Sequence, residues 1–329
     1  MTDIASGPAA PGSQAGPRPE AIKAIPVRHP WRWVSGALVL AFAGDVVYTF
    51  ATAPDLRWDQ VWKWLSGRLI LEGIVITLEL TVLAMVIGIV LGIVLAVMRL
   101  SPSPVMSWVS WLYIWFFRGT PVLVQIFFWF NLNTVLPHIG IGIPGTPLHW
   151  QESTNLLISA FTAATLGLGL NEAAYMAEIV RAGIISVEQG QTEAAQALGM
   201  NRLQVMRRIV LPQAMRVIIP PTGNETISML KTTSLASIAA VPELFTRSEQ
   251  IANFTFLVIE LAIVASIWYL AMTTVLTIGQ YYVERYFARG AQRELPPTPF
   301  QRFRRMLFTF HAPPPAVPDV SVSFPPGRR

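Results

Sequence analysis

The sequence predicts an all-α membrane protein with about six spanning helices. Hydrophobic residues make up 53% of the 329 residues and charged residues only 13%, whereas roughly a quarter of a soluble domain is charged. Several apolar runs reach about 18 residues or more, which is long enough to cross the hydrocarbon core of a bilayer. The chain contains no cysteine. Disulfides, zinc–thiolate sites and cysteine nucleophiles are therefore excluded.

Hydropathy places the six spans at about 33–53, 68–98, within 105–136, 155–182, 213–245 and 255–284. Gly88 and Gly92 form a pair of small residues four positions apart, which is suited to close helix packing in the second span. The third span is interrupted at residues 118–121. We expect a second helix to start there, with Thr120 as its N-cap and Pro121 at its first position.

The positions of Lys and Arg predict the orientation and the domain boundaries. Both tails, 1–30 and 285–329, and the loop 184–212 are basic, so the positive-inside rule places both termini and this loop in the cytosol. Residues 1–30 are expected to be a disordered tail, and 285–329 a basic, Pro-rich tail. Residues 31–67 are expected to hold an additional N-terminal helix with an external loop, and 68–284 the transmembrane core.

The cytosolic loop 184–212 has the composition of two short helices joined by a corner. Ser186 and Gln189 form a candidate capping box at the start of the first helix. Gly199 lies where a helix commonly ends in the left-handed conformation. A second helix is expected to start at Asn201 and to end near residue 211, because Pro212 disfavours helix in the residue before it.

This loop also carries a motif with fixed spacing: Glu-Ala-Ala at 193–195, Gly199, and Ile-x-Leu-Pro at 209–212. Together with the segments 117–125, 174–183 and 223–235, it resembles the permease subunits of polar amino-acid ABC importers of the histidine/glutamine/arginine type. That family often has Gln where this chain has Glu225. The first span, the tails and the Gly/Pro-rich stretch 137–151 are additions to the common pattern.

The resemblance implies a type I ABC importer fold, with a five-helix core and one extra N-terminal helix, in a bacterial inner membrane. It implies a second permease subunit, identical or paralogous, a cytosolic ATPase dimer and an extracytoplasmic amino-acid-binding protein. The residues implied to couple the chain to the ATPase are Glu193, Ala194, Ala195, Gly199, Ile209, Leu211 and Pro212.

Polar residues inside spans are costly and indicate a substrate pathway by default. In the fourth span they follow one helical stripe, and in the fifth a similar stripe comes just after Pro220–Pro221, which we expect to break or kink the helix near mid-depth. An amino-acid zwitterion needs a carboxylate and an ammonium partner, which Lys231 and either Glu225 or Glu178 could supply. The alternative is that these groups only stabilise packing; Glu178 could simply pair with Arg181. The candidates are Asn171, Tyr175, Glu178, Asn224, Glu225, Ser228, Lys231 and Thr232.

Several chemistries find no support in the sequence. No P-loop motif is present, so ATP is expected to be used by a separate partner, with no cofactor bound by this chain. No metalloprotease spacing or nucleophile elbow occurs, so no catalytic or metal-binding residues are predicted. An ion-coupled secondary transporter of amino acids is the main alternative, but it would be favoured by duplicated halves, which are not found. A non-transporting scaffold would not need polar stripes on two spans, and the net charge of +5 does not indicate nucleic acid.

Overall fold

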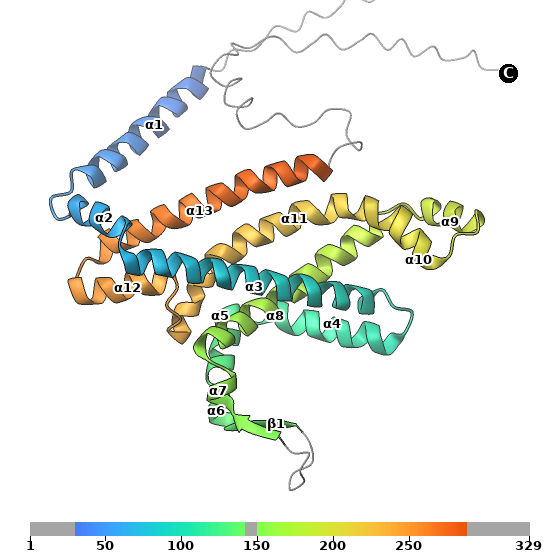
Figure 1. Ribbon diagram of the computed structural model, residues 1–329. Coiled ribbons are helices and arrows are strands. Elements are labelled where there is room, and N and C mark those ends of the chain that lie inside the picture. The colour runs from blue at the N-terminus through green and yellow to red at the C-terminus, as the bar shows by residue number, and fades with distance from the viewer. Residues whose placement is uncertain (1–29, 142–149, 288–329) are drawn as a thin grey trace, which may run out of the picture. The chain divides into compact units, whose positions relative to one another are not determined.

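The computed structural model describes residues 30–141 and 150–287, in two compact units that divide between Leu56 and Arg57. The first unit is described by one apolar helix, α1 (Pro30–Ala51). The second unit is a helical bundle with one small hairpin (Figure 1). Its elements are α2 (Trp58–Leu65), α3 (Arg68–Arg99), α4 (Pro104–Gly119), α5 (Val122–Phe130), α6 (Leu132–Val135), β1 (His138–Ile141), β2 (Trp150–Ser153), α7 (Thr154–Leu157), α8 (Ala160–Ile185), α9 (Gln189–Ala197), α10 (Arg202–Val205), a π-helical turn (Met206–Val210), α11 (Leu211–Thr232), a 3₁₀ segment (Thr233–Ala239), α12 (Leu244–Thr255) and α13 (Val258–Phe287).

Helices occupy all six predicted span positions. By length and apolar character, three described helices can cross a membrane: α1 from Trp33 onward, α3 and α13. The bent pair α4–α5 adds a fourth if it counts as one span. The other two positions hold α8 and α11, which have 26 and 22 residues but carry the polar stripes. The fifth helix ends earlier than predicted, because a 3₁₀ segment follows it and Ala240 then turns the chain in a left-handed conformation.

The centre of the second unit is the contact between α3 and α8, and the predicted small pair makes it possible. A Cβ atom on Gly88 would lie 2.5 Å from the Cγ of Glu172, and one on Gly92 would lie 2.5 Å from the Cβ of Met176. Such distances are far inside van der Waals contact, so only glycine allows the two backbones to come this close. The prediction of close packing at Gly88 and Gly92 is confirmed.

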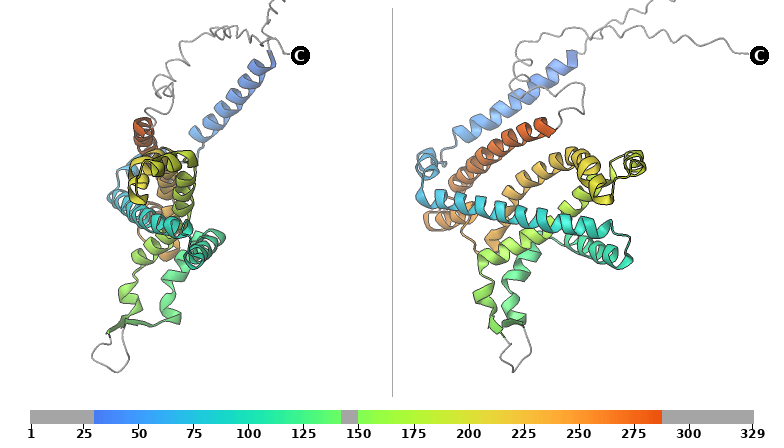
Figure 2. Two further views of the ribbon diagram at one scale, coloured as in Figure 1. Left: turned by 90° about the vertical axis from the view of Figure 1, so that its right-hand side faces the viewer. Right: turned by 45° about the vertical axis from the view of Figure 1, so that its right-hand side comes forward.

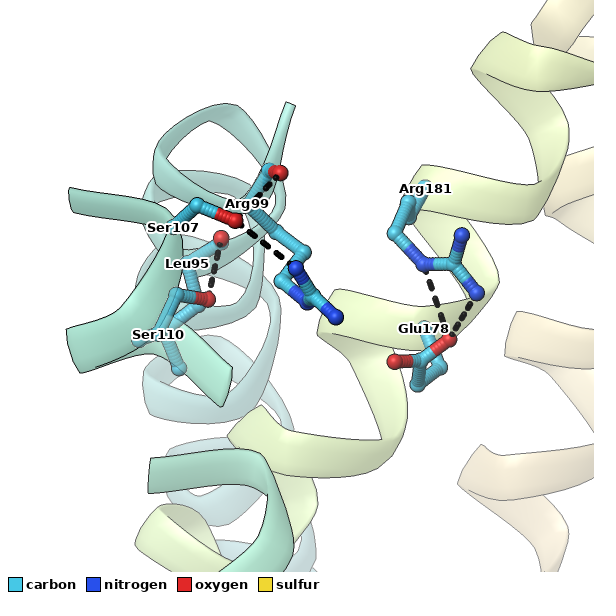
Figure 3. Close-up of polar contacts among 6 residues, drawn as sticks. All are labelled: Leu95, Arg99, Ser107, Ser110, Glu178 and Arg181. Carbon is cyan, nitrogen blue, oxygen red and sulfur yellow. Dashed lines mark hydrogen bonds and ion pairs between the residues drawn. The ribbon is translucent and has the colours of Figure 1, made fainter. Parts of the chain in front are cut away.

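The turn between α3 and α4 is held by side-chain hydrogen bonds (Figure 3). Arg99 Nη1 donates to Ser107 Oγ at 2.7 Å, and Ser110 Oγ donates to the Leu95 carbonyl at 2.7 Å. Because the second bond satisfies a buried hydroxyl, it costs little to bury Ser110 completely between the helices.

The predicted interruption of the third span is present: α4 and α5 meet at an angle of 98°. The predicted cap is wrong. The Thr120 hydroxyl bonds back to the Phe116 carbonyl at 2.9 Å, so it completes the end of α4, and Pro121 occupies the N-cap position of α5. The break is stabilised instead by Gln125, whose amide donates to the Phe117 carbonyl at 3.0 Å and to Thr120 Oγ1 at 2.8 Å.

The prolines of α11 do not break the helix, so of the two predicted outcomes, a break or a kink, the break is wrong. Helical structure runs from Leu211 to Thr232 through Pro220 and Pro221, and the ribbon of α11 curves along its length (Figure 1). Polar side chains bind nearby carbonyl groups of α11. Thr222 Oγ1 donates to the Ile218 carbonyl at 2.8 Å, and Gln280 Nε2 of α13 donates to the Pro220 carbonyl at 3.2 Å. These bonds lie beside the prolines, whereas the carbonyl groups that lose their amide donors are four residues before each proline, at Arg216 and Val217.

A buried carboxylate that the sequence analysis missed joins three helices at the end of the bundle opposite α9. Glu243 caps α12 and is completely buried. Its oxygens accept hydrogen bonds from the Thr246 and Phe245 backbone amides at 2.6 and 2.9 Å, from the Tyr269 hydroxyl of α13 at 2.9 Å, and from Thr77 of α3 at 3.5 Å. The group is therefore fully paired and has a structural role.

The predicted external loop 137–151 contains a two-stranded antiparallel hairpin, in which Ile139 is opposite Glu152. With α5, α6 and α7 it extends away from the helices around α3 (Figure 2). The segment 31–67 contains α1 and α2, and α2 packs within the second unit through buried Val61. The predicted tails 1–30 and 285–329 lie almost entirely outside the described residues.

Candidate functional site

The loop between α8 and α11 forms a small helical knob at one end of the bundle, beside the α3–α4 turn (Figure 1). Gly199 has a φ of +79°, so the predicted left-handed corner is confirmed. Asn201 and Gln204 form a complete capping box, with both hydrogen bonds at 2.9 Å, which confirms the start of the second helix.

Two local predictions in this loop are wrong. Ser186 does not cap α9, because its hydroxyl donates to the Gly183 carbonyl at 2.7 Å and so finishes α8. The second helix does not end at residue 211. It continues through a π-helical turn, Met206–Val210, into α11, with Pro212 in the first turn of that helix. A proline is tolerated there because the amide it lacks has no obligatory partner in a first turn.

The motif residues divide into a buried and an exposed set. Ala195 is buried against Val205 and Val210, with Ile209 packed on the same cluster. Glu193 and Ala194 are exposed, as are Gly199, Leu211 and Pro212. Leu198, one residue before the corner, is 84% exposed. A slim helix with an exposed leucine at its end is suited to a groove on another protein.

A second candidate site is a cavity of about 280 Å³ between α8, α11 and the start of α5. This is near the lower bound of small-molecule sites, roughly 300 Å³. Five of the predicted pathway residues line it, and so does Glu172, which the sequence analysis missed. The lining is Val122, Leu168, Asn171, Glu172, Tyr175, Glu225, Ser228, Met229 and Thr232.

The cavity is acidic. Its described lining contains two carboxyl side chains, Glu172 and Glu225, and neither Lys nor Arg. Glu172 is 3% exposed, and its Oε1 has no hydrogen-bond partner in the part of the chain that the structure describes. A buried acceptor without a partner is costly. The arrangement therefore favours a ligand that brings hydrogen-bond donors and positive charge.

Glu172 has a recognisable signal in the sequence, since it is an acidic residue inside a span. Glu172 does not belong to the polar stripe of Asn171, Tyr175 and Glu178. It follows Asn171 directly and so points about 100° away from it around the helix. Only the packing of α11 against α8 shows that this direction also opens on the cavity.

Three predicted pathway residues lie elsewhere. Asn224 faces α13, where its Oδ1 accepts a hydrogen bond from Gln280 Nε2 at 3.0 Å. Lys231 is exposed, and its side chain has no hydrogen bond or ion pair with the described residues. Glu178 pairs with Arg181 at 2.7 Å on the same helix, as the packing alternative expected (Figure 3). The structure thus does not bring Lys231 together with either candidate carboxylate.

Glu178 does line a neighbouring groove of about 430 Å³ between α4 and α8, with Trp111, Ile114, Trp115, Arg118, Gly119 and Tyr175. Tyr175 lines both spaces. The Arg118 guanidinium lies over the Tyr175 ring, 5.2 Å from its centroid. Asn171 adds a tie to the same region, because its amide donates to the Phe117 carbonyl at 2.7 Å at the end of α4.

Comparison with known proteins identifies the family. Residues 88–289 match the family described as "Binding-protein-dependent transport system inner membrane component". The "Arginine transport system permease protein ArgU" of Corynebacterium glutamicum is 48% identical over 298 residues, which cover 90% of this chain and 91% of that protein. The "Probable amino-acid permease protein YxeN" of Bacillus subtilis is 38% identical over 66% of this chain and 90% of that protein.

A solved structure agrees with these relatives. The "Crystal structure of an amino acid ABC transporter with histidines" superposes with a TM-score of 0.57 at 35% identity and covers 66% of this chain and 94% of that chain. The resemblance to importer permeases and the type I importer fold are thereby confirmed. The chain belongs to the family of inner membrane components of binding-protein-dependent transport systems.

Proposed function

We propose that the chain is the permease subunit of an ATP-driven importer for amino acids with cationic side chains. The observation that carries this proposal is the cavity lined by Glu172 and Glu225 without a Lys or Arg in its described lining. A guanidinium or ammonium group would supply the donors that the buried Glu172 lacks. Charge-assisted hydrogen bonds of this kind are about twice as strong as neutral ones.

The polar residues at the cavity edge suit the rest of such a substrate. Ser228 and Thr232 of α11 offer hydroxyl groups, and Asn171 and Tyr175 of α8 offer an amide and a phenol. These groups can hydrogen-bond the α-carboxylate and α-ammonium common to all amino acids. In this assignment the acidic pair sets selectivity and the hydroxyl groups hold the shared part of the substrate.

The relatives support the substrate class. The protein with 48% identity is named for arginine transport, and further relatives are named for glutamine, L-cystine, nopaline and octopine. This range supports amino acids as the common substrate, and the acidic cavity of this chain supports the cationic members among them.

The knob of α9 and α10 supports coupling to a separate ATPase. We infer that Glu193, Ala194 and Leu198 enter a groove of a cytosolic ATPase dimer, while buried Ala195 holds α9 in place. ATP would then be bound by the partner, with no cofactor on this chain. The chain would lie in the bacterial inner membrane with both termini in the cytosol, on the same side as the basic knob.

The mechanism that follows is alternating access. A loaded binding protein docks outside on a pair of permease subunits, which are identical or paralogous. ATP closes the ATPases, which move α9 with the helices on either side of it. Since α8 and α11 lead directly into the knob and also line the cavity, movement of the knob is passed to the substrate.

Competition for binding tests the substrate class. The solubilised transporter without its binding protein is equilibrated with labelled arginine in the presence of excess unlabelled competitors of matched size, so that only the membrane site is measured. Lysine and ornithine are expected to compete, whereas glutamine and glutamate are not. Competition by glutamate as strong as that by lysine would refute the assignment of the acidic cavity to a cationic side chain.

A further inference from the structure

Tyr175 is the residue shared by the acidic cavity and the α4–α8 groove. The cavity lies toward Leu168 on α8 and the groove toward Glu178, which is three residues closer to α9. At ~1.5 Å per residue, the groove is displaced along α8 by about one turn in the direction of the knob. The two spaces therefore follow one another along the helix, with Tyr175 between them.

The groove has charged groups in its lining. Arg118 and Glu178 line it, and ionic groups facing lipid would be costly, which favours water in this space. A larger groove of about 490 Å³ between α11 and α13 contrasts with it, because that lining is made mainly of residues such as Ile219, Ile227 and Val275. Of these two grooves, the α4–α8 groove is the one that suits a charged substrate moving from the cavity toward the knob.

A contact between two helices lies at Tyr175, where the two spaces meet. The Arg118 guanidinium of α4 lies 5.2 Å from the centroid of the Tyr175 ring of α8. Arg118 comes just before the break between α4 and α5, and a Cβ on the next residue, Gly119, would meet open space. The Gly119 side of this turn is therefore open, while the Phe117 carbonyl on the other side of Arg118 is held by Gln125 and Asn171.

We propose that Tyr175 and Arg118 form the gate through which substrate leaves the acidic cavity toward the α9–α10 end of the bundle. The proposal rests on the proposed function, since it assigns the cavity to the substrate. Tyr175 lies in α8, and α9 is the next helix along the chain. A displacement of α9 is therefore passed to α8 and to the Tyr175 ring. Rotation of α8 separates the ring from Arg118, and the substrate's positive charge then meets Glu178 in the groove.

The absence of cysteine from the chain allows a direct test. Ser228→Cys places one thiol in the cavity, and Trp115→Cys places one in the groove as a reference. The full transporter is prepared in inside-out vesicles and treated with a membrane-impermeant methanethiosulfonate. The rate of modification is followed by the mass of the permease chain. The measured quantity is the rate at Ser228→Cys divided by the rate at Trp115→Cys.

Opening the gate is expected to raise this ratio. Tyr175→Ala removes the ring, and loss of one cation–π contact shifts an open–closed balance by about five- to tenfold. Arg118→Met removes the cation instead and is expected to have an effect of the same size, so the test does not depend on one variant folding. Tyr113→Ala is the matched control: Tyr113 also bridges α4 and α8, through a hydrogen bond to the Leu170 carbonyl at 2.9 Å, but it lines neither space.

The outcomes separate the gate from the proposed function. The gate is refuted if neither Tyr175→Ala nor Arg118→Met raises the ratio, or if Tyr113→Ala raises it equally, which would indicate loosened packing. Arginine added to the vesicles should slow modification of Ser228→Cys by occupying the cavity. If arginine gives no protection while the gate variants still raise the ratio, the assignment of the cavity to the substrate fails and the gate remains as a passage for another solute.

Discussion

Exchange of Glu172 for glutamine tests the acidic cavity most sharply. The substitution keeps the size of the side chain and removes its charge, so the contact of Glu172 with Gly88 of α3 is retained. Glu172 is 3% exposed and lines the cavity, so the hydrogen bond that is lost is one made to the bound substrate. A hydrogen bond to a charged group is worth about 1.5–3 kcal/mol, which corresponds to roughly a 10- to 150-fold weaker Kd for arginine.

The assay is equilibrium binding of labelled arginine to the solubilised transporter without its binding protein, so that only the membrane site is measured. Citrulline provides the comparison, because it has the shape of arginine with a neutral urea group. Its Kd is expected to change only about 2- to 10-fold in Glu172→Gln, since a neutral hydrogen bond is worth less. Glu79→Gln is the matched control, because Glu79 is exposed on α3 and does not line the cavity. A folded Glu172→Gln protein that loses arginine and citrulline affinity equally would refute the reasoning.

Three further predictions concern coupling and stability. Gly199→Ala places a side chain at a φ of +79°, at a cost of about 1–2 kcal/mol. Uptake should fall while the partner's ATPase activity persists. Gly190→Ala is the control, because a Cβ there meets open space within α9, and it should leave uptake unchanged. Gly92→Leu introduces an atom 2.5 Å from a side chain of α8, so the yield of folded protein in detergent should fall sharply; a normal yield would contradict the packing account. Tyr269→Phe removes a hydrogen bond to buried Glu243 and should lower stability by about 1–3 kcal/mol, visible as a lower Tm, without changing the Kd for arginine.

The sequence analysis succeeded where local chemistry decides the structure. Gly199 needs a left-handed conformation whatever surrounds it, and Asn201 with Gln204 satisfies its own backbone within four residues. The apolar spans follow from hydropathy in the same way. These features depend on residues close together in sequence, so the pattern of the chain is enough to predict them.

It failed where two local arrangements compete. The Ser186 and Thr120 hydroxyl groups bond to carbonyl groups three and four residues earlier, in the preceding helix, instead of capping the next helix. Pro220 and Pro221 were expected to break or kink α11, and the helix continues through both of them. In each case the sequence allows both arrangements and does not select between them.

The candidate site was predicted in outline but not in composition. Five pathway residues do line one cavity, because their helical stripes face each other. Lys231 and Asn224 lie on the same helix as Glu225 but point elsewhere, and Glu172 was missed. The direction in which α11 crosses α8 decides which faces meet. That crossing depends on a contact between distant residues, Gly183 of α8 with Ile218 of α11, where a Cβ on the glycine would collide with the Ile218 side chain.

ATP-dependent uptake is the measurement that tests the central claim most directly. Vesicles that hold this chain, its ATPase and its binding protein are supplied with labelled arginine. Uptake is measured with and without the ATPase subunit, and with and without an imposed proton or sodium gradient. The account predicts uptake that is lost when the ATPase or ATP is removed. Uptake that continues without the ATPase and follows a proton or sodium gradient would contradict it and identify an ion-coupled transporter instead.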